Sequence, residues 1–279
     1  MSAIDLDAYF ERIGYGGGRT PTLDTLRAIH LRHPQSIPFE NLNPLLGLPV
    51  RLDAPSLQQK LLFEGRGGYC FEQNLLLSHV LKELGFRVTE LAARVLWNTP
   101  EGAVRPRSHM LLLVDLDAGP YVADVGFGGL TLTGPLRLQP DAEQATPHEP
   151  FRLIKMDEEF VLQARFDEAW RPLYRFGLEK QLLPDYEVTN WYLSNHPESQ
   201  FVTGLMAARP EPDRRYALRN NRLTVHHRTG RTEQRVLASA AEMRQTLESA
   251  FHLRLPDTPD LDIALTEIVR RADLMTSVK

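Results

Sequence analysis

The chain is poor in cysteine, with one, Cys70, among 279 residues. A single thiol excludes an internal disulfide and a zinc site built from several thiolates. No run of about 18 consecutive apolar residues occurs, so we expect no membrane-spanning helix. The first 18 residues are acidic early and contain no long apolar core, unlike a signal peptide. These absences predict a soluble, cytoplasmic protein with no membrane partner.

An excess of positive charge is also missing. The 32 Lys and Arg are outnumbered by 36 Asp and Glu, which gives a net charge of −4. No general basic field would attract nucleic acid, and we expect no nucleic-acid partner. The 42% of hydrophobic residues provide ample material for a core. The length is compatible with two domains or with one larger domain.

The expected elements change in type along the chain. Helical spacing of apolar residues dominates the first third, alternating strand patterns the middle, and a mixture the end, which favours an α+β fold. Residues 36–50 are broken by prolines and indicate a connection, and residues 185–202 have no clean period. The patterns predict helices near 5–14, 22–33, 55–65, 70–85, 239–253 and 260–275, and strands near 87–97, 109–116, 121–127, 150–156, 159–166, 171–177 and 215–237.

Cys70 stands where one of these helices begins, directly after "RGGY". A helix N-terminus lowers the pKa of a thiol, and the thiolate is the reactive form. Gly67 and Gly68 allow a tight turn and close approach to a ligand. The alternative is a small buried hydrophobic residue, because free cysteine is often buried. Position alone leaves both interpretations open.

A cysteine nucleophile needs a base, and the base needs an orienting group. His109 begins an apolar strand pattern, and Asp124 interrupts another one, where an unpaired carboxylate would be costly. His30 and His79 lie within helical patterns, and we expect them to be packing or surface residues. The order Cys70, His109, Asp124 on a helix and two strands favours a thiol triad.

The strand register raises a difficulty for this triad. A tight turn at residues 118–119 would place Asp124 opposite Leu113. His109 would then lie four residues away, roughly 13 Å along the strand. Only a bulge, a strong twist or a different turn would bring the two side chains together.

With these motifs in place, the chain resembles the arylamine N-acetyltransferases. The resemblance is carried by five motifs in order, with a looser match over the last 75 or so residues. The motifs are "AYFERIGY" near the start, "IPFENL" at 37–42, "RGGYCFEQN" at 66–74, "RSHMLLLV" at 107–114 and "DVGFGG" at 124–129.

The resemblance implies an α+β fold of three parts and a papain- or transglutaminase-like arrangement of the cysteine triad. These parts are a helical bundle with the nucleophile, a β-barrel-like domain with the histidine and aspartate, and a linker with an α/β lid. The expected boundaries are 1–86, 87–190 and 191–279.

The resemblance also assigns roles to residues. Cys70 matches the acetylated nucleophile, His109 the base and Asp124 its orienting partner. The implied reaction is a ping-pong transfer from acetyl-CoA, the cosubstrate, to an aromatic amine, hydrazine or arylhydroxylamine, with no metal. The implied acceptor-binding residues are Phe39, Val95, Ser108, Phe127 and Phe201, and the implied coenzyme-binding residues are Gly126 and Gly128.

Three alternatives remain open at this point. A thiol hydrolase or amidase would use the same triad and transfer the acyl group to water. A macrolactam-forming amide synthase would have a larger acceptor groove. A non-catalytic binding module would leave Cys70 unreactive.

Overall fold

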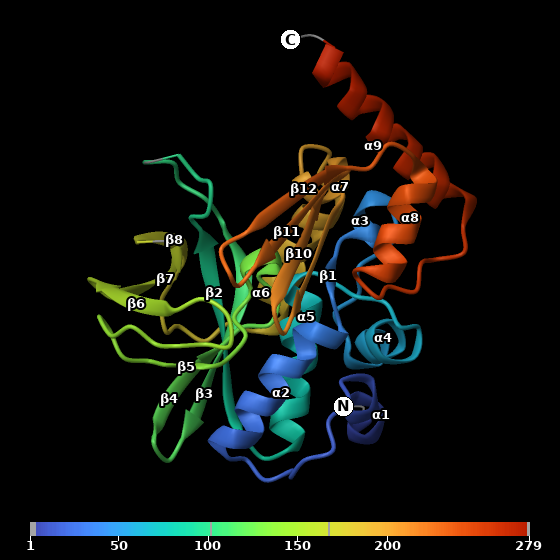
Figure 1. The fold of residues 1–279 in the computed structure, drawn as a ribbon. Helices are drawn as coiled ribbons and strands as arrows, with labels where there is room; N and C mark the ends of the chain where they lie inside the picture. Colours follow the sequence, from blue (N-terminus) through green and yellow to red (C-terminus); the bar gives the residue numbers. More distant parts are fainter. Residues whose placement is uncertain (1–3, 101, 167, 278–279) are drawn as a thin grey trace.

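The computed structural model describes residues 4–100, 102–166 and 168–277, and the first third of the chain is mainly helical (Figure 1). Thr22 is the N-cap of α2 (Leu23–Ser36), and its side chain accepts the Thr25 backbone N–H. Gly85, with φ +88°, follows the end of the helix that Cys70 begins. These elements are α1 (Leu6–Arg12), α2 (Leu23–Ser36), α3 (Leu42–Leu45), α4 (Ala54–Gln58), the π-helical turn η1 (Gln59–Phe63) and α5 (Cys70–Glu83).

A seven-stranded antiparallel sheet forms the middle of the molecule, in the order β5-β4-β3-β2-β8-β7-β6. Register shifts at Ala93/Arg94 and at Leu162/Gln163 bend it, because a bulge increases the local twist. The sheet therefore curls like a barrel (Figure 1). Its strands are β2 (Arg87–Val95), β3 (Arg107–Leu116), β4 (Gly119–Ala123), β5 (Leu136–Arg137), β6 (Phe151–Met156), β7 (Glu159–Phe166) and β8 (Ala169–Phe176), with the 3-10 turn η2 (Gly128–Leu130) after β4.

A second sheet, of order β1-β9-β10-β11-β12, belongs mainly to the last third. Its edge strand β1 comes from the first third: Phe39 pairs with Ala208 of β9, and the Glu40 N–H donates to the Gly68 carbonyl. Two helices, α6 and α7, join the two sheets, and α8 and α9 close the chain (Figure 1). The bounds are β1 (Phe39–Glu40), α6 (Leu183–Asn195), α7 (Gln200–Thr203), β9 (Met206–Glu211), β10 (Arg214–Arg219), β11 (Arg222–His227), β12 (Thr232–Val236), α8 (Ala240–Ser249) and α9 (Pro259–Ser277).

The largest core joins the helices to the central sheet. Helix α5 packs on β2 and β3, so that Leu76 of the helix and Met110 and Leu112 of β3 share one fully buried cluster. As a result, the first residue of α5 lies next to the first residues of β3. The mixed helix and sheet architecture confirms the expected α+β fold.

Three expected segments differ from the structure. Residues 185–202, which lack a clean period, form α6 and α7, because α6 buries Tyr186 and Leu193 while Val188 and Trp191 stay exposed. Residues 36–50, expected to be a connection, contain β1 and α3. The helix expected near 55–65 continues from α4 into a π-helical turn. Apolar patterns alone do not distinguish these cases.

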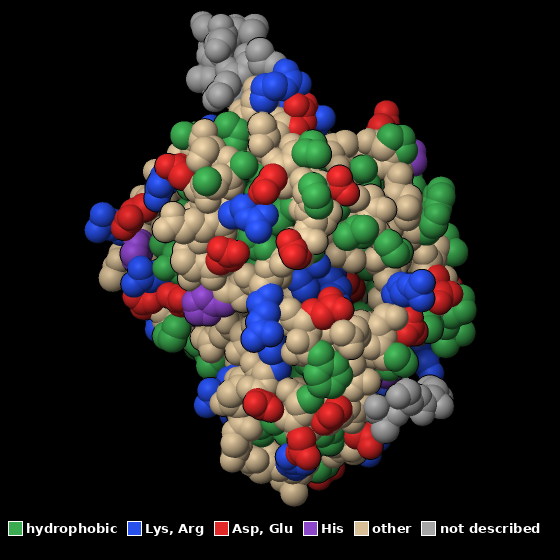
Figure 2. Space-filling model, turned by 90° about the vertical axis from the view of Figure 1, so that its right-hand side faces the viewer, with side chains coloured by type: hydrophobic (Ala, Val, Ile, Leu, Met, Phe, Trp, Pro, Cys, Tyr) green, Lys and Arg blue, Asp and Glu red, His purple; other side chains and the backbone are tan. Residues whose placement is uncertain are grey.

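The surface has no dominant sign of charge on the face that Figure 2 shows. Basic, acidic and hydrophobic side chains are interspersed there without a large area of one kind. Among the described residues, no helix is both long enough and apolar enough to span a membrane.

Candidate active site

Cys70 is the first residue of α5 and is almost fully buried. Its Sγ lies 3.8 Å from the carbonyl oxygen of Ser108, the residue before His109 on β3. A residue of the first turn caps the helix: the Glu72 carboxylate accepts the Tyr69 backbone N–H at 3.0 Å.

His109 and Asp124 are in direct contact, with 2.7 Å between His109 Nε2 and Asp124 Oδ2. Both side chains are buried. The expectation that Asp124 lies opposite Leu113 is wrong by two residues, because the turn is formed by residues 117–118 and Leu112 pairs with Ala123. Asp124 therefore follows the last paired residue of β4, only two positions from His109, where the chain leaves the sheet.

The Asp124 carboxylate is held from several sides. Its Oδ1 accepts from Asn74 Nδ2 and from the Gly126 backbone N–H, both at 2.9 Å. Thr131 Oγ1 donates to the Asp124 carbonyl at 3.2 Å. Asn74 lies one helical turn after Cys70, so the helix that begins at the thiol also fixes the carboxylate.

The electrostatics favour a charged pair. Burial alone would lower the pKa of His109, but the charge and hydrogen bond of Asp124, together with Cys70, raise it to about 10. Burial would raise the pKa of Asp124, but His109, Asn74 and the Gly126 N–H hold it below its ordinary value. With Nε2 bonded to Asp124, the other ring nitrogen, Nδ1, is left for the thiol. The arrangement can stabilise an imidazolium next to Cys70 at neutral pH.

The glycine loop after Asp124 packs against the nucleophile. A Cβ at Gly126 would lie 2.8 Å from the Cys70 Cα, which no side chain tolerates. Gly128 has φ +80°, a conformation that L side chains rarely adopt, and a Cβ there would lie 3.7 Å from the Phe39 ring. Both positions thus require glycine, and the chain passes directly beside Cys70.

Aromatic rings border the three residues. Phe127 lies 5.1 Å from the His109 ring, measured between centroids. Phe201 lies 5.2 Å from Tyr69 and 6.3 Å from Phe39. Phe39, Phe127 and Phe201 are each partly exposed, so they offer apolar surface to a ligand.

Val95 and Ser108 occupy different positions. Ser108 contacts the thiol through its carbonyl. Val95 pairs across the sheet with Tyr174, whose ring lies 4.9 Å from His109. The described residues contain no group of three or more His, Cys, Asp or Glu arranged to hold a metal ion.

Sequence reasoning missed three neighbours of the triad. Asn74 could have been predicted, because a residue four positions after Cys70 lies one helical turn away on the same face. Tyr174 sits in an ordinary strand pattern, and nothing in it indicates a site. His30, expected to be a packing or surface residue, is fully buried and accepts the Asp124 backbone N–H at 3.0 Å. That contact spans 94 residues, and no local pattern reveals it.

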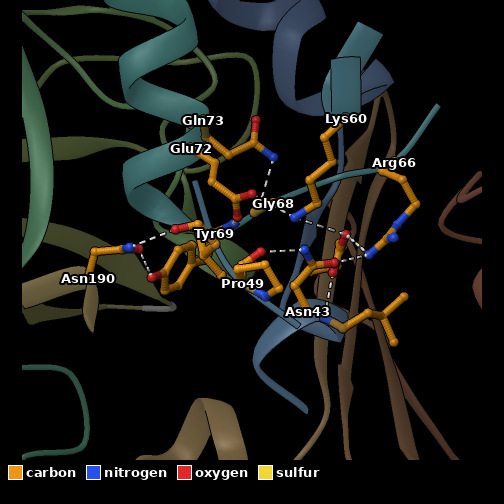
Figure 3. A network of polar contacts seen from close by, with 12 residues as sticks. Asn43, Pro49, Lys60, Arg66, Gly68, Tyr69, Glu72, Gln73 and Asn190 are labelled. Atoms are coloured by element: carbon orange, nitrogen blue, oxygen red, sulfur yellow. Dashed lines mark hydrogen bonds and ion pairs between the residues drawn. The ribbon is translucent and has the colours of Figure 1, made fainter. Parts of the chain in front are cut away.

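A buried ionic network supports the loop before Cys70 (Figure 3). Arg66 donates to Glu40 at 2.9 Å and to Asn43 at 3.0 Å. Lys60 lies 2.6 Å from Glu72 and 3.7 Å from Glu40. Burial raises the pKa of Glu72 against the opposing charge of Lys60. The network thus connects the arginine of "RGGYC" to the carboxylate that caps α5.

We expect Arg66→Gln to destabilise the fold. Glutamine removes the cation and leaves the fully buried Glu40 with Lys60 alone, and breaking a buried pair typically costs about 3–5 kcal/mol. Chemical denaturation monitored by circular dichroism measures this loss. Arg27→Gln is the control, because its pair with Asp24 is exposed and should contribute nothing measurable. Equal stability of the two variants would contradict the assignment.

Comparisons with known proteins give a consistent result. A family model described as N-acetyltransferase matches residues 22–260. A curated arylamine N-acetyltransferase of Mycobacterium tuberculosis is 46% identical over 276 residues, which cover 96% of this chain and 97% of the relative. The solved structure of M. smegmatis arylamine N-acetyltransferase has 44% identity and a TM-score of 0.92, covering 96% of this chain and 99% of that one. The structure of Mycobacterium marinum arylamine N-acetyltransferase in complex with CoA has 42% identity and a TM-score of 0.91, covering 95% and 99%.

Proposed function

The chain belongs to the arylamine N-acetyltransferase family, and from this premise we propose a ping-pong transfer of acetyl through Cys70. The donor is acetyl-CoA. The acceptors are aromatic amines, hydrazines or arylhydroxylamines. The family membership makes the protein an acyltransferase; the covalent intermediate and the residue roles are the proposal.

The observation that carries the proposal is the placement of Cys70. Its thiol stands at a helix N-terminus beside His109, whose other ring nitrogen is bonded to Asp124. In the first half-reaction the thiolate attacks the thioester carbonyl, the bond to the CoA sulfur breaks, and the imidazolium of His109 gives its proton to the leaving sulfur. The acetyl group is then held as a thioester on Cys70, and His109 is neutral.

The second half-reaction reverses these roles. The acceptor nitrogen attacks the acetyl-Cys70 carbonyl, and His109 takes a proton from that nitrogen. The bond to Sγ breaks, which releases the amide and restores the thiolate and the imidazolium. Asp124 keeps the ring oriented throughout and stabilises its charge whenever His109 holds the proton, in the manner of other cysteine and serine triads.

The acceptor must reach the intermediate while water is kept away. Phe127 lies beside the His109 ring and Phe201 beside Tyr69, the residue before Cys70. We propose that these two and Phe39, which contacts Phe201, bind the acceptor ring together with Val95 and Ser108. An apolar lining disfavours water and accepts a flat ring.

We propose that Gly126 and Gly128 border the coenzyme arm. The close approach of Gly126 to the Cys70 backbone, where no Cβ fits, supports this role. CoA bound in the M. marinum relative supports the choice of donor.

We further propose three functional parts: residues 1–86, which carry the nucleophile, residues 87–190, which carry His109 and Asp124, and residues 191–279, which form the linker and lid. The second sheet and its own buried cluster, which includes Phe251, support the third part.

Mass spectrometry of the intact protein after incubation with acetyl-CoA tests the proposal. We expect one added acetyl group, located by peptide mapping on Cys70, and its rapid loss when an aromatic amine is added. CoA without the acetyl group is the control and should add nothing. A label on another residue, or no label, contradicts the mechanism. Loss of the label equally fast without amine would indicate a thiol hydrolase instead.

A further inference from the structure

His30 of α2 touches the site from behind. His30 is not one of the three triad residues, and its side chain is fully buried. Its Nε2 lies 3.0 Å from the backbone nitrogen of Asp124. Since a backbone N–H can only donate, Nε2 must accept, and it carries no proton.

The histidine is therefore neutral, with its proton on Nδ1. Burial lowers the pKa of His30 to about 4, against the opposing charge of Asp124. A protonated ring would present an N–H to the Asp124 N–H, and the hydrogen bond would be lost. The site thus holds one buried histidine neutral and a second, His109, charged.

The Asp124 main chain needs such an acceptor. Strand β4 ends at Ala123, so the next N–H lies beyond the last residue that pairs with β3. Thr131 bonds the Asp124 carbonyl and His30 bonds its N–H, so both main-chain polar groups are fixed. The direction of the carboxylate toward His109 depends on this main-chain position.

The other ring nitrogen indicates that packing alone does not explain the residue. Nδ1 of His30 is buried and has no hydrogen-bond partner among the described residues. A buried unpaired polar atom typically costs about 1–3 kcal/mol, which a leucine or phenylalanine would avoid. The fold accepts this cost at a position where the opposite nitrogen meets the triad.

We propose that His30 is a positioning residue for the acyl transfer: its neutral imidazole anchors the Asp124 main chain and so aims the carboxylate at His109. The role in turnover rests on the proposed function. The effect on Cys70 reactivity does not, because it requires only the coupling of Asp124, His109 and the thiol.

Two substitutions separate the acceptor from the volume of the ring. His30→Phe keeps the ring shape but removes the acceptor, whereas His30→Gln places an amide oxygen near the position of Nε2. Tyr9→Phe is the matched control. It removes one buried hydrogen bond, of 2.9 Å, to His33, which lies on the same helix as His30, and this bond does not involve Asp124.

The primary measurement is the rate of Cys70 alkylation by iodoacetamide near pH 6.5, without any acyl donor. We expect His30→Phe to slow alkylation and to lower kcat/KM by about tenfold to a hundredfold, because a displacement of about 1 Å can cost about 10²-fold. The KM for acetyl-CoA should change little. His30→Gln should recover most of both rates, and Tyr9→Phe should leave both unchanged despite a lower melting temperature.

Several outcomes would overturn the proposal. Normal alkylation in folded His30→Phe would do so, as would an equal loss in Tyr9→Phe or no recovery in folded His30→Gln. Should His30→Phe fail to fold, nitrogen NMR of the wild-type histidines decides, since the proposal requires an unprotonated Nε2 and a protonated Nδ1 at neutral pH. A failure of the proposed function would look different: wild-type Cys70 would alkylate rapidly but acquire no acetyl group.

Discussion

Cys70→Ser is expected to abolish acetyl transfer and to leave the fold intact. A serine hydroxyl has nearly the shape of the thiol but is not ionised at neutral pH, so the imidazolium of His109 would face a weak nucleophile. The turnover number should fall by about 10⁴-fold or more, because loss of the nucleophile costs as much as loss of a whole triad. The serine hydroxyl can donate to the Ser108 carbonyl, which lies 3.8 Å from Sγ, so the substitution leaves no unpaired buried donor.

The experiment follows both half-reactions in the variant. Neither an acetylated protein nor free CoA should accumulate above background, while far-ultraviolet circular dichroism and the melting temperature stay close to wild type. Gly126→Ala provides a contrasting variant. It retains the thiol but forces a Cβ against the Cys70 backbone, and should lower activity together with stability. Substantial transfer by folded Cys70→Ser would rule out a thioester on Cys70.

Asp124→Asn is the second large effect that we expect. Asparagine keeps the shape but removes the charge that, with its hydrogen bond, raises the pKa of His109 to about 10. It can also hold the wrong tautomer of the ring, and the corresponding change in a serine triad costs about 10⁴-fold in turnover. Iodoacetamide alkylation of Cys70 should slow markedly below pH 7 and recover only in alkali. An unshifted pH profile of alkylation in the folded variant would contradict the claim that Asp124 acts on Cys70 through His109.

The same pair makes stability depend on pH with a definite sign. The pKa of His109 is raised in the fold from an ordinary 6.5 to about 10, so its contribution is complete below 6.5 and disappears as the pH rises to about 10. The pKa of Asp124 is lowered from an ordinary 3.8, so its contribution is present above 3.8 and lost in acid. The stability difference between wild type and Asp124→Asn should therefore be largest between about pH 4 and 6.5, and smaller at pH 9.5.

How far the sequence predicts this site depends on the range of the contacts. Cys70 at a helix start follows from a local pattern, and the structure places it there. The contact between His109 and Asp124 did not follow, because moving the turn by one residue shifts the register by two positions. His30 was inaccessible to any periodicity argument, since its contact joins a helix to a loop far along the chain.

The fold shows the same division. Capped helices and alternating strands carry their own signals, and the α+β class follows from their order. Helix α6 has no apolar periodicity, because its apolar residues face both the core and the solvent. Strand β9 contains adjacent alanines and a proline, which neither favour nor indicate a strand.

The pairing of β1 with β9 has a consequence for the order in which the protein is made. The segment before Cys70 is bonded to β1, and β1 finds its sheet partner only at Ala208. Asn41 next to β1 likewise donates to the carbonyls of Phe201 and Gly204, which lie 160 and 163 residues along the chain. Contacts of such sequence separation form late in folding. During synthesis Cys70, His109 and Asp124 therefore all emerge from the ribosome long before Ala208, the sheet partner of Phe39, has been translated.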